Sequence, residues 1–259
     1  MIKQGQTFNL LLVIFATVVA IYFITTIKKT GKRPYIRPIP AVQALPELVG
    51  RAAEMGRPIH FAGGQGGLSS TWSSGIASIM NSLLVYGEIV RLAAPTNTRV
   101  IYTTGDTANL PVAEDIGLAA AVKAGHPEYK QDLRFISSNP RSYMSGIMGI
   151  VAREKVASQF SLLGGEETLT AVYIAAQVGA MQIGGTTFIP NASWYVTGSD
   201  YFLIGEECVA LSAIFGEDPS MTGCIMGEDI VKIFYIILIS LSAIAITAGN
   251  KAIINFLTM

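Results

Sequence analysis

The sequence predicts an α/β fold, in which a parallel β-sheet lies between two layers of helices and a transmembrane helix lies near each end of the chain. Short apolar runs repeatedly pass into glycine or small polar residues and then into helical patterns, as expected of strands that alternate with helices. Two long apolar stretches lie near the termini. With 51% hydrophobic and only 14% charged residues, the chain is also more apolar than ordinary soluble proteins, in which about 25% of residues are charged.

The N-terminal apolar stretch is Thr7–Ile27, which contains no charged residue. It has about the length that a helix needs to cross roughly 30 Å of hydrocarbon. A cleaved signal peptide is the alternative, but this apolar core is longer than that of a signal peptide and no small-x-small cleavage site follows it. We therefore expect a retained transmembrane helix at residues 7–27, with residues 1–6 outside the cell.

A basic juxtamembrane linker, residues 28–39, follows this stretch. Its basic residues are Lys28, Lys29, Lys32, Arg33 and Arg37. The other side of the stretch has only Lys3 and the amino terminus. The positive-inside rule therefore predicts that the N-terminus lies outside and that the next part of the chain lies in the cytoplasm.

The second apolar stretch is Ile230–Ala248. Its one charged residue, Lys232, lies near the domain-side end, where a lysine can snorkel to the membrane surface. A hydrophobic core helix is the alternative, which the scarcity of polar residues disfavours. Two spans would return the C-terminal tail, residues 249–259, to the outside. The sequence thus predicts a two-span protein of the cell membrane, with a single cytoplasmic α/β domain at residues 40–223 and both termini outside.

The strands of this domain are expected where apolar runs end in small residues. The clearest case is Ile59–Gly67, where a strand at Ile59–Ala62 runs into four glycines and then into a Ser/Thr-rich helix start. Weaker versions predict strands at Arg99–Tyr102, Leu133–Ile136, Gln159–Leu163 and Ala180–Ile183, with a further β segment near Trp194–Val196. These strands are continuously apolar rather than alternating, which indicates a parallel sheet covered on both faces, as in Rossmann-like three-layer domains.

Single helices are expected between the strands. The helical patterns end at Gly56 for the first and cover Ser69–Leu92, Asn109–Ala124, Pro140–Val151, Glu166–Gln177 and Asp200–Phe215 for the others. Asn109 is the expected N-cap of its helix. Right-handed crossovers would bring all strand-to-helix turns to one edge of the sheet, which is the edge where such folds bind ligands.

The glycine turns at that edge are the candidate ligand-binding site. Its residues are Gly63, Gly64, Gly66, Gly67, Ser69, Gly105, Asp106, Gly164, Gly165, Gly184 and Gly185. Helix N-termini bind anions, which suggests a nucleotide or a phosphate. However, the spacing matches neither GxGxxG nor GxxxxGK[ST], and Thr103-Thr104 stand where an acidic residue is expected. Tight turns and close packing of helices on the sheet are the favoured alternative.

Two pairs of adjacent carboxylates are candidates for acid–base chemistry. Glu166 and Glu167 lie in the first turn of a helix, where capping and the helix dipole explain them. Glu206 and Glu207 lie in an apolar helical pattern, so one of them needs a partner. We expect an internal or intersubunit salt bridge to Arg134 or Arg153, with a functional carboxylate as the alternative.

Other chemistries find little support. His60 lies within a strand and is expected to be a hydrogen-bonded core residue, whereas His126 lies in a turn at the surface. No HxH, HExxH, CxxC or GxSxG spacing occurs, so neither a metal site nor a catalytic residue is predicted, and no cofactor is implied. Lys+Arg and Asp+Glu balance at 18 each, which disfavours nucleic-acid binding. Cys208 and Cys224 are expected to be buried free thiols, with a single bridge as the alternative.

The segment Ala41–Gly64, and above all the run GRAAEMGRP at Gly50–Pro58, resembles a family of prokaryotic two-span membrane proteins known only as a domain of unknown function. The N-terminal apolar stretch and the basic segment after it fit the same layout. The resemblance implies the membrane topology and the cytoplasmic α/β domain. It implies no activity and no catalytic residue.

The leading hypothesis is a membrane-anchored, non-enzymatic structural protein that works by association with copies of itself or with a larger membrane complex. Small-residue helix faces at Gly75–Ser78 and Gly146–Gly149 suit close packing. The second hypothesis is a binding domain, possibly enzymatic, for a nucleotide or another anionic ligand at the glycine turns. An accessory transport subunit is a third. The partners expected are therefore the lipid bilayer and a homo-oligomer or larger complex.

Overall fold

The computed structural model of the protein describes residues 7–31, 35–64, 66–68, 73–162, 167–216 and 219–247. The chain divides into two compact units. The α/β unit is Ile36–Phe215, and the helical unit combines Met1–Tyr35 with Gly216–Met259. Each unit is described by itself.

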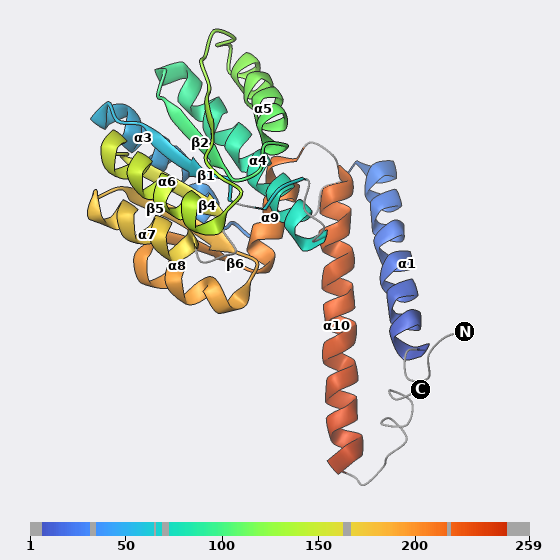
Figure 1. The fold of residues 1–259 in the computed structure, drawn as a ribbon. Helices are drawn as coiled ribbons and strands as arrows, with labels where there is room; N and C mark the ends of the chain where they lie inside the picture. The colour runs from blue at the N-terminus through green and yellow to red at the C-terminus, as the bar shows by residue number, and fades with distance from the viewer. Residues whose placement is uncertain are drawn as a thin grey trace. The chain divides into compact units, whose positions relative to one another are not determined.

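The α/β unit contains a six-stranded sheet in which all neighbouring strands are parallel and the order is β3-β2-β1-β4-β5-β6 (Figure 1). The strands are β1 Ile59–Ala62, β2 Val100–Thr104, β3 Asp132–Phe135, β4 Ser158–Leu162, β5 Met181–Thr186 and β6 Tyr201–Ile204. This is the strand order of Rossmann folds, with a topological switch point between the adjacent strands β1 and β4. The predicted fold class, a Rossmann-like parallel α/β domain, is confirmed.

Helices follow the strands in the predicted alternation. Their bounds are α2 Pro40–Gln43, α3 Leu45–Met55, α4 Ser73–Ala93, α5 Asn109–Lys123, α6 Pro140–Glu154, α7 Glu167–Gln177, α8 Ala192–Gly198 and α9 Glu206–Phe215, with short 3-10 turns at Ala94–Thr96 and Ile189–Asn191. Gly56 ends α3 in the left-handed conformation, at φ +61°, as its position after the helical pattern predicts.

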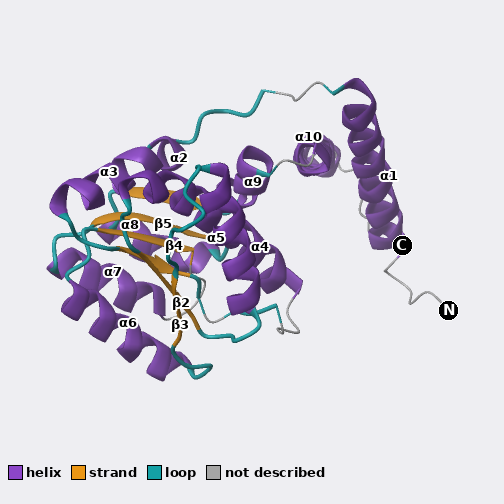
Figure 2. Ribbon diagram, turned by 90° about the horizontal axis from the view of Figure 1, so that it is seen from above, coloured by secondary structure: helices purple, strands orange, loops and turns teal. Residues whose placement is uncertain are grey.

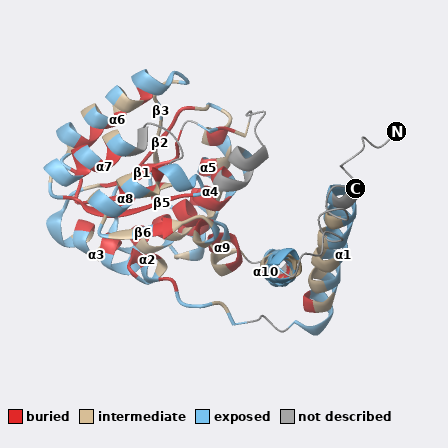
Figure 3. Cartoon of the chain, turned by 90° about the horizontal axis from the view of Figure 1, so that it is seen from below, coloured by how far each residue is buried: buried red, intermediate tan, exposed pale blue. Residues whose placement is uncertain are grey.

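The helices form one layer on each face of the sheet (Figure 2). Buried side chains of α3, α4, α5 and α9 form one cluster with the strands, and those of α6, α7 and α8 form the other. Figure 3 shows buried residues along the strands and on the sides of the helices that face them, with exposed residues on the outer sides. A sheet covered on both faces explains why its strands read as continuous apolar runs.

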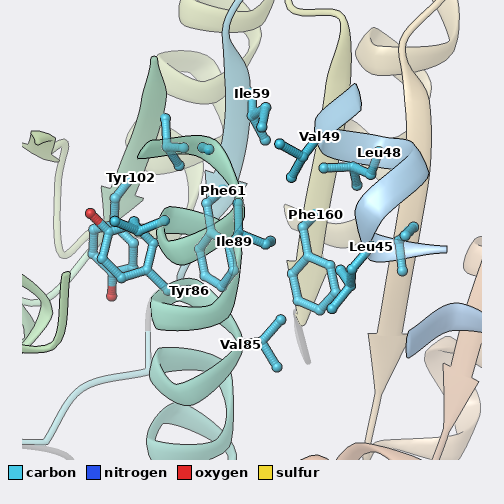
Figure 4. Close-up of a cluster of buried hydrophobic side chains, with 14 of the residues drawn as sticks. Leu45, Leu48, Val49, Ile59, Phe61, Val85, Tyr86, Ile89, Tyr102 and Phe160 are labelled. Atoms are coloured by element: carbon cyan, nitrogen blue, oxygen red, sulfur yellow. The ribbon is translucent and has the colours of Figure 1, made fainter. Parts of the chain in front are cut away.

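Aromatic rings fill the centre of the first cluster (Figure 4). Phe61 of β1 is fully buried, and its ring centroid lies 5.4 Å from that of Tyr86, 5.6 Å from that of Tyr102 and 5.2 Å from that of Phe160. These residues come from α4, β2 and β4. One side chain on the central strand therefore joins two neighbouring strands and the helix that covers them.

Two predicted elements of the α/β unit are wrong. The β segment near Trp194–Val196 is helix α8, because the buried Tyr195 packs against β5, where its ring takes the space of a side chain on Gly184. The helix predicted at Asp200–Phe215 begins only at Glu206. Its first part is β6, which pairs with β5 from Ile183↔Tyr201 onwards. In both places tertiary packing overrides the local pattern.

The helical unit consists of α1, Thr7–Thr30, and α10, Pro219–Thr247, which lie side by side. Small residues bring the two backbones together: a Cβ on Gly223 would lie 2.8 Å from the Cα atom of Ile24, and one on Gly227 would lie 3.0 Å from that of Ala20. From Gly223 to Gly227 the residue number rises along α10, whereas the facing residue of α1 changes from Ile24 to Ala20, so the helices are antiparallel. Gly223 and Gly227, both on α10, have the GxxxG spacing of closely packed membrane helices.

Among the described residues, two helices are long and apolar enough to cross a membrane by length and composition: Asn9–Thr30, with 22 residues, and Ser220–Thr247, with 28. The first matches the predicted stretch at residues 7–27. The second begins well before the predicted Ile230, so it also contains Glu228 and Asp229, which the prediction left outside the span. Residues 1–6 and 249–259 lie outside the described part of the chain.

Candidate functional site

The carboxyl edge of the sheet brings several of the predicted site residues together. Gly63 and Gly64 follow β1 directly, and Gly105 and Asp106 follow β2. The N–H of Gly63 donates to the carbonyl of Thr103 (2.8 Å), and that of Gly105 donates to the carbonyl of Gly64 (2.9 Å), so the two turns extend the pairing of their strands. Gly64 has φ +80°, which a residue with a side chain rarely adopts.

The remaining predicted site residues have other surroundings. Gly66 is exposed, whereas Gly184 and Gly185 lie buried inside β5. A Cβ on Gly184 would meet the ring of Tyr195, and one on Gly185 would lie 2.7 Å from the Cβ atom of Leu203. Ser69, Gly164 and Gly165 lie outside the described residues. Ligand binding at these positions stays a prediction.

Side chains of the protein occupy the space beside two glycines of the first turn. A Cβ on Gly63 would lie 2.5 Å from the hydroxyl oxygen of Tyr102, and one on Gly67 would collide with the carboxylate of Asp106. That carboxylate accepts a hydrogen bond from the N–H of Ala108 (2.9 Å), which fixes it at the start of α5. The two glycines therefore allow close approach of the turn after β2, and the group beside Gly67 is negatively charged.

A buried amide holds the two turns together. Asn109 donates from Nδ2 to the carbonyl of Gly66 (3.1 Å) and to the hydroxyl of Thr104 (3.0 Å), and its Oδ1 accepts from the N–H of Leu68 (3.1 Å). The prediction that Asn109 is the N-cap of its helix is wrong, because Ala108 is the N-cap. The side chain of Asn109 instead forms hydrogen bonds with the backbone of the glycine turn, at the carbonyl of Gly66 and the N–H of Leu68.

A second polar network lies beneath the turn. The N–H of Gly64 donates to the hydroxyl of Tyr143 (3.1 Å), and that hydroxyl donates to the carbonyl of Thr103 (3.1 Å). The ring of His60 is hydrogen-bonded to Oγ1 of Thr103 (3.0 Å) and to Oε1 of Gln159 (3.2 Å). The network joins β1, β2, β4 and α6.

Burial lowers the pKa of His60 to about 4, so the ring is neutral at neutral pH. The expectation that His60 is a hydrogen-bonded core residue is confirmed. Sequence reasoning missed its partners Thr103 and Gln159, and it missed Tyr143, which joins the same network through Thr103. The signal available was the presence of polar residues inside the strands IHFA, VIYTT and SQFSL.

The carboxylate pair Glu206 and Glu207 begins α9, where the helix dipole stabilises negative charge. Glu207 forms its salt bridge with Arg37 (2.7 Å), so the predicted partners Arg134 and Arg153 are wrong. Arg134 lies on β3, at the opposite edge of the sheet from β6, and pairs with Asp132 (2.7 Å). Glu166 and the side chain of Glu167 lie outside the described part.

A cavity of about 620 Å³ lies beside the edge strand β6, away from the glycine turns after β1 and β2. Most of its lining is apolar, and it includes Ile189, Tyr201, Phe202, Ile204 and the start of α9 at Glu206 and Glu207. Phe188 and Ile189, just after β5, are more than half exposed, and Phe202 is 40% exposed. Sequence reasoning missed this surface because it assigned Tyr201–Ile204 to a helix.

Cys208 is buried and free, as expected, and burial raises the pKa of its thiol to about 12. Cys224 is also free but exposed, so the expectation of two buried thiols is wrong for it, because its neighbour Gly223 faces α1 and Cys224 does not. Among the described residues, no group of three or more His, Cys, Asp or Glu side chains is placed to hold a metal ion.

Comparison with known proteins identifies the family. Searches among curated proteins and among solved structures each found no match. A family model matches residues 1–257, nearly the whole chain, and therefore covers both apolar helices as well as the α/β unit. The chain thus belongs to the family described as Domain of unknown function (DUF6754), in agreement with the resemblance carried by Ala41–Gly64.

Proposed function

We propose that the protein is anchored in a membrane by α1 and α10 and that its α/β unit, on the cytoplasmic side, mediates oligomerisation or docking in a membrane complex. The close antiparallel packing of the two helices at Gly223 and Gly227 supports the anchor, because membrane helices associate through small residues of this spacing. The basic residues Lys28 and Lys29 in the last turn of α1 support a cytoplasmic α/β unit.

The observation that carries the proposal is the apolar surface around β6. This strand lies at the edge of the sheet, so no other strand of the described residues pairs with one side of its backbone. Phe188, Ile189 and Phe202 expose apolar surface beside it, next to the apolar cavity. Exposed apolar patches and free strand edges are typical of surfaces that another protein covers.

The occupation of the glycine turn also supports association over catalysis. Tyr102 and Asp106 fill the space beside Gly63 and Gly67, which explains these glycines by packing. The buried His60 is hydrogen-bonded on both ring nitrogens, so neither nitrogen is free to act as a general base.

The mass of the protein purified in mild detergent tests the proposal. We expect a species whose protein mass is a multiple of 27.6 kDa, or one that contains partner subunits. Phe202→Glu should give a smaller species, because a charge on the β6 surface opposes its burial. Leu118→Glu, at an equally exposed position on α5, is the matched control and should leave the mass unchanged. A strictly monomeric wild-type protein at all concentrations would contradict the proposal.

Nucleotide binding is the second candidate, favoured by the strand order and by Asp106. In Rossmann folds an acidic residue at the end of β2 binds the ribose hydroxyls, and here Thr103-Thr104 occupy that position. The carboxylate of Asp106, two residues beyond the end of β2, nevertheless lies beside Gly67 of the first turn.

A thermal-shift panel of nucleotides and phosphate tests this candidate. Nucleotide binding predicts that at least one ligand raises the melting temperature of the wild-type protein. The same ligand should not raise the melting temperature of Gly66→Trp. Gly66 is the position at which a substitution disturbs the fold least, because it is exposed and a Cβ there meets only the end of the Ile79 side chain, at 3.1 Å. A substitution of Gly64 would instead strain the backbone, because Gly64 has φ +80°. The absence of stabilisation by every ligand of the panel would exclude it.

A further inference from the structure

The register of the helix pair places three charged residues opposite the middle of α1. Gly227 of α10 lies against Ala20, and the rings of Phe234 and Phe15 lie 5.0 Å apart. Glu228, Asp229 and Lys232 lie between these two contacts along α10 and therefore at the level of Phe15–Ala20. This level is the centre of the apolar stretch Thr7–Ile27.

The same register favours a deep position for these charges over a shallow one. If the apolar part of α10 from Ile230 onwards alone filled the hydrocarbon, the second half of α1, Val18–Ile27, would be lifted into water. That half is as apolar as the first. The hydrophobic stretch of α1 is satisfied only when the bilayer also contains Glu228, Asp229 and Lys232.

These charges lie on the face of α10 that is turned away from α1. Residues spaced by four lie on one face of a helix, so Cys224, Glu228 and Lys232 share a face that differs from that of Gly223 and Gly227. Lys232 Nζ lies 3.5 Å from Glu228 Oε1 and 3.4 Å from Asp229 Oδ1. The side chain of Asp229 is nevertheless 63% exposed in the helical unit, and two carboxylates share one ammonium group.

Lipid cannot solvate a carboxylate in this position. Charged side chains at the centre of a membrane are costly and almost always face a protein partner or a water-filled cavity. The outer face of α10, which we define as Glu228, Asp229 and Lys232 with Cys224 at its margin, therefore needs a cover of protein with groups that complement both signs of charge.

We propose that this cover is the outer face of α10 in a second copy of the chain, related by a twofold axis along the membrane normal. The inference rests on the membrane anchoring proposed above. Copies inserted with the same topology bring the same residues to the same depth. In a twofold contact, any contact of one residue with a second residue of the other copy occurs twice, once in each direction. Lys232 of each copy then lies against Asp229 of the other, while Glu228 stays beside Lys232 of its own helix (3.5 Å).

Oxidative cross-linking in native membranes tests the proposal, because Cys224 lies on the outer face and is exposed. Treatment with copper phenanthroline should give a covalent dimer of twice 27.6 kDa. Cys224→Ser should abolish it, whereas Cys208→Ser should not, because Cys208 is buried in the α/β unit. Resistance to alkaline carbonate extraction is measured on every sample to show that the chain remains inserted.

Charge variants identify the pairing. Asp229→Lys alone and Lys232→Asp alone should each lower the dimer yield by roughly tenfold, because like charges then face each other across the axis. Co-expression of the two variants with different tags should restore cross-linking, as the mixed dimer only, because positions 229 and 232 then face opposite charges across the axis. Pairing within one helix predicts no such rescue, since each of the two chains still lacks its internal partner.

The outcomes separate this inference from the anchoring. An inserted wild-type chain that gives no Cys224 dimer, or a mixed pair that is not rescued, overturns the twofold contact and leaves the anchor standing. A cross-link of Cys224 to a protein of another mass overturns it as well. A chain that carbonate extracts from the membrane overturns the anchoring itself.

Discussion

Replacing Phe61 by alanine is expected to destabilise the α/β unit by about 3–5 kcal/mol, the usual cost of removing a buried aromatic side chain. Its ring is fully buried and stacks between the rings of Tyr102 and Phe160, with Tyr86 at its edge. The resulting cavity would lie between two strands and a helix that cannot close on it. The free energy of unfolding of the full chain in mild detergent, from denaturant titration, measures the effect.

Phe61→Leu is the matched control for this position. Leucine retains most of the apolar volume, so we expect a loss smaller than that of the alanine variant. Equal stability of the wild type and Phe61→Ala would contradict the assignment of Phe61 to the centre of the core.

Acid should destabilise the α/β unit through His60. Its pKa is about 4 in the folded protein, mainly because burial disfavours the charged ring, against 6.5 for the ordinary side chain. Below pH 6.5 the unfolded chain therefore binds a proton that the folded chain does not. The free energy of unfolding should fall by about 1.4 kcal/mol per pH unit, or about 3 kcal/mol in all, between pH 6.5 and pH 4.

His60→Gln separates this effect from other titrating groups. Glutamine keeps a polar side chain next to Thr103 and Gln159 but does not titrate, so the variant should lose about 3 kcal/mol less than the wild type over the same pH range. The measurement is the free energy of unfolding of both proteins at pH 7 and at pH 4. Identical pH dependence in the two proteins would show that His60 is solvated rather than buried.

Most of the sheet could be predicted because its strands carry a strong local signal. The run Ile59–Ala62, which is apolar apart from His60 and is followed by glycines, is typical of a buried strand that ends in a tight turn. The strand β6 carries the same signal, since Tyr201–Ile204 is followed by Gly205 and two glutamates, much as the β4 run Phe160–Leu163 is followed by two glycines and two glutamates. The apolar residues resume at Cys208 directly after this short break, so the two elements read as one helix.

The helix α8 could not be predicted from its sequence. Trp194, Tyr195 and Val196 all favour strands, and the helix forms because Tyr195 packs on Gly184 of the neighbouring strand. That contact joins residues on two different elements, which the local sequence around either residue does not reveal. The same contact gives Gly184 a packing role, which a sequence cannot distinguish from a binding role.

The candidate site shows the same limit. The glycines of the first turn were identified, but what fills the space beside them depends on Tyr102 and Asp106, which belong to the next strand and its turn. The hydrogen bonds of Asn109 likewise reach back to Gly66 and Leu68 across the fold. Glycine spacing indicates that something approaches closely, and only the fold reveals what it is.

Cysteine accessibility in intact cells tests the central claim, that α1 and α10 cross a membrane and hold the α/β unit on its cytoplasmic side. In a background of Cys208→Ser and Cys224→Ser, a membrane-impermeant maleimide should label Lys3→Cys in intact cells. It should label Lys130→Cys, an exposed position of the α/β unit, only after the cells are permeabilised. Labelling of Lys130→Cys in intact cells would contradict the account.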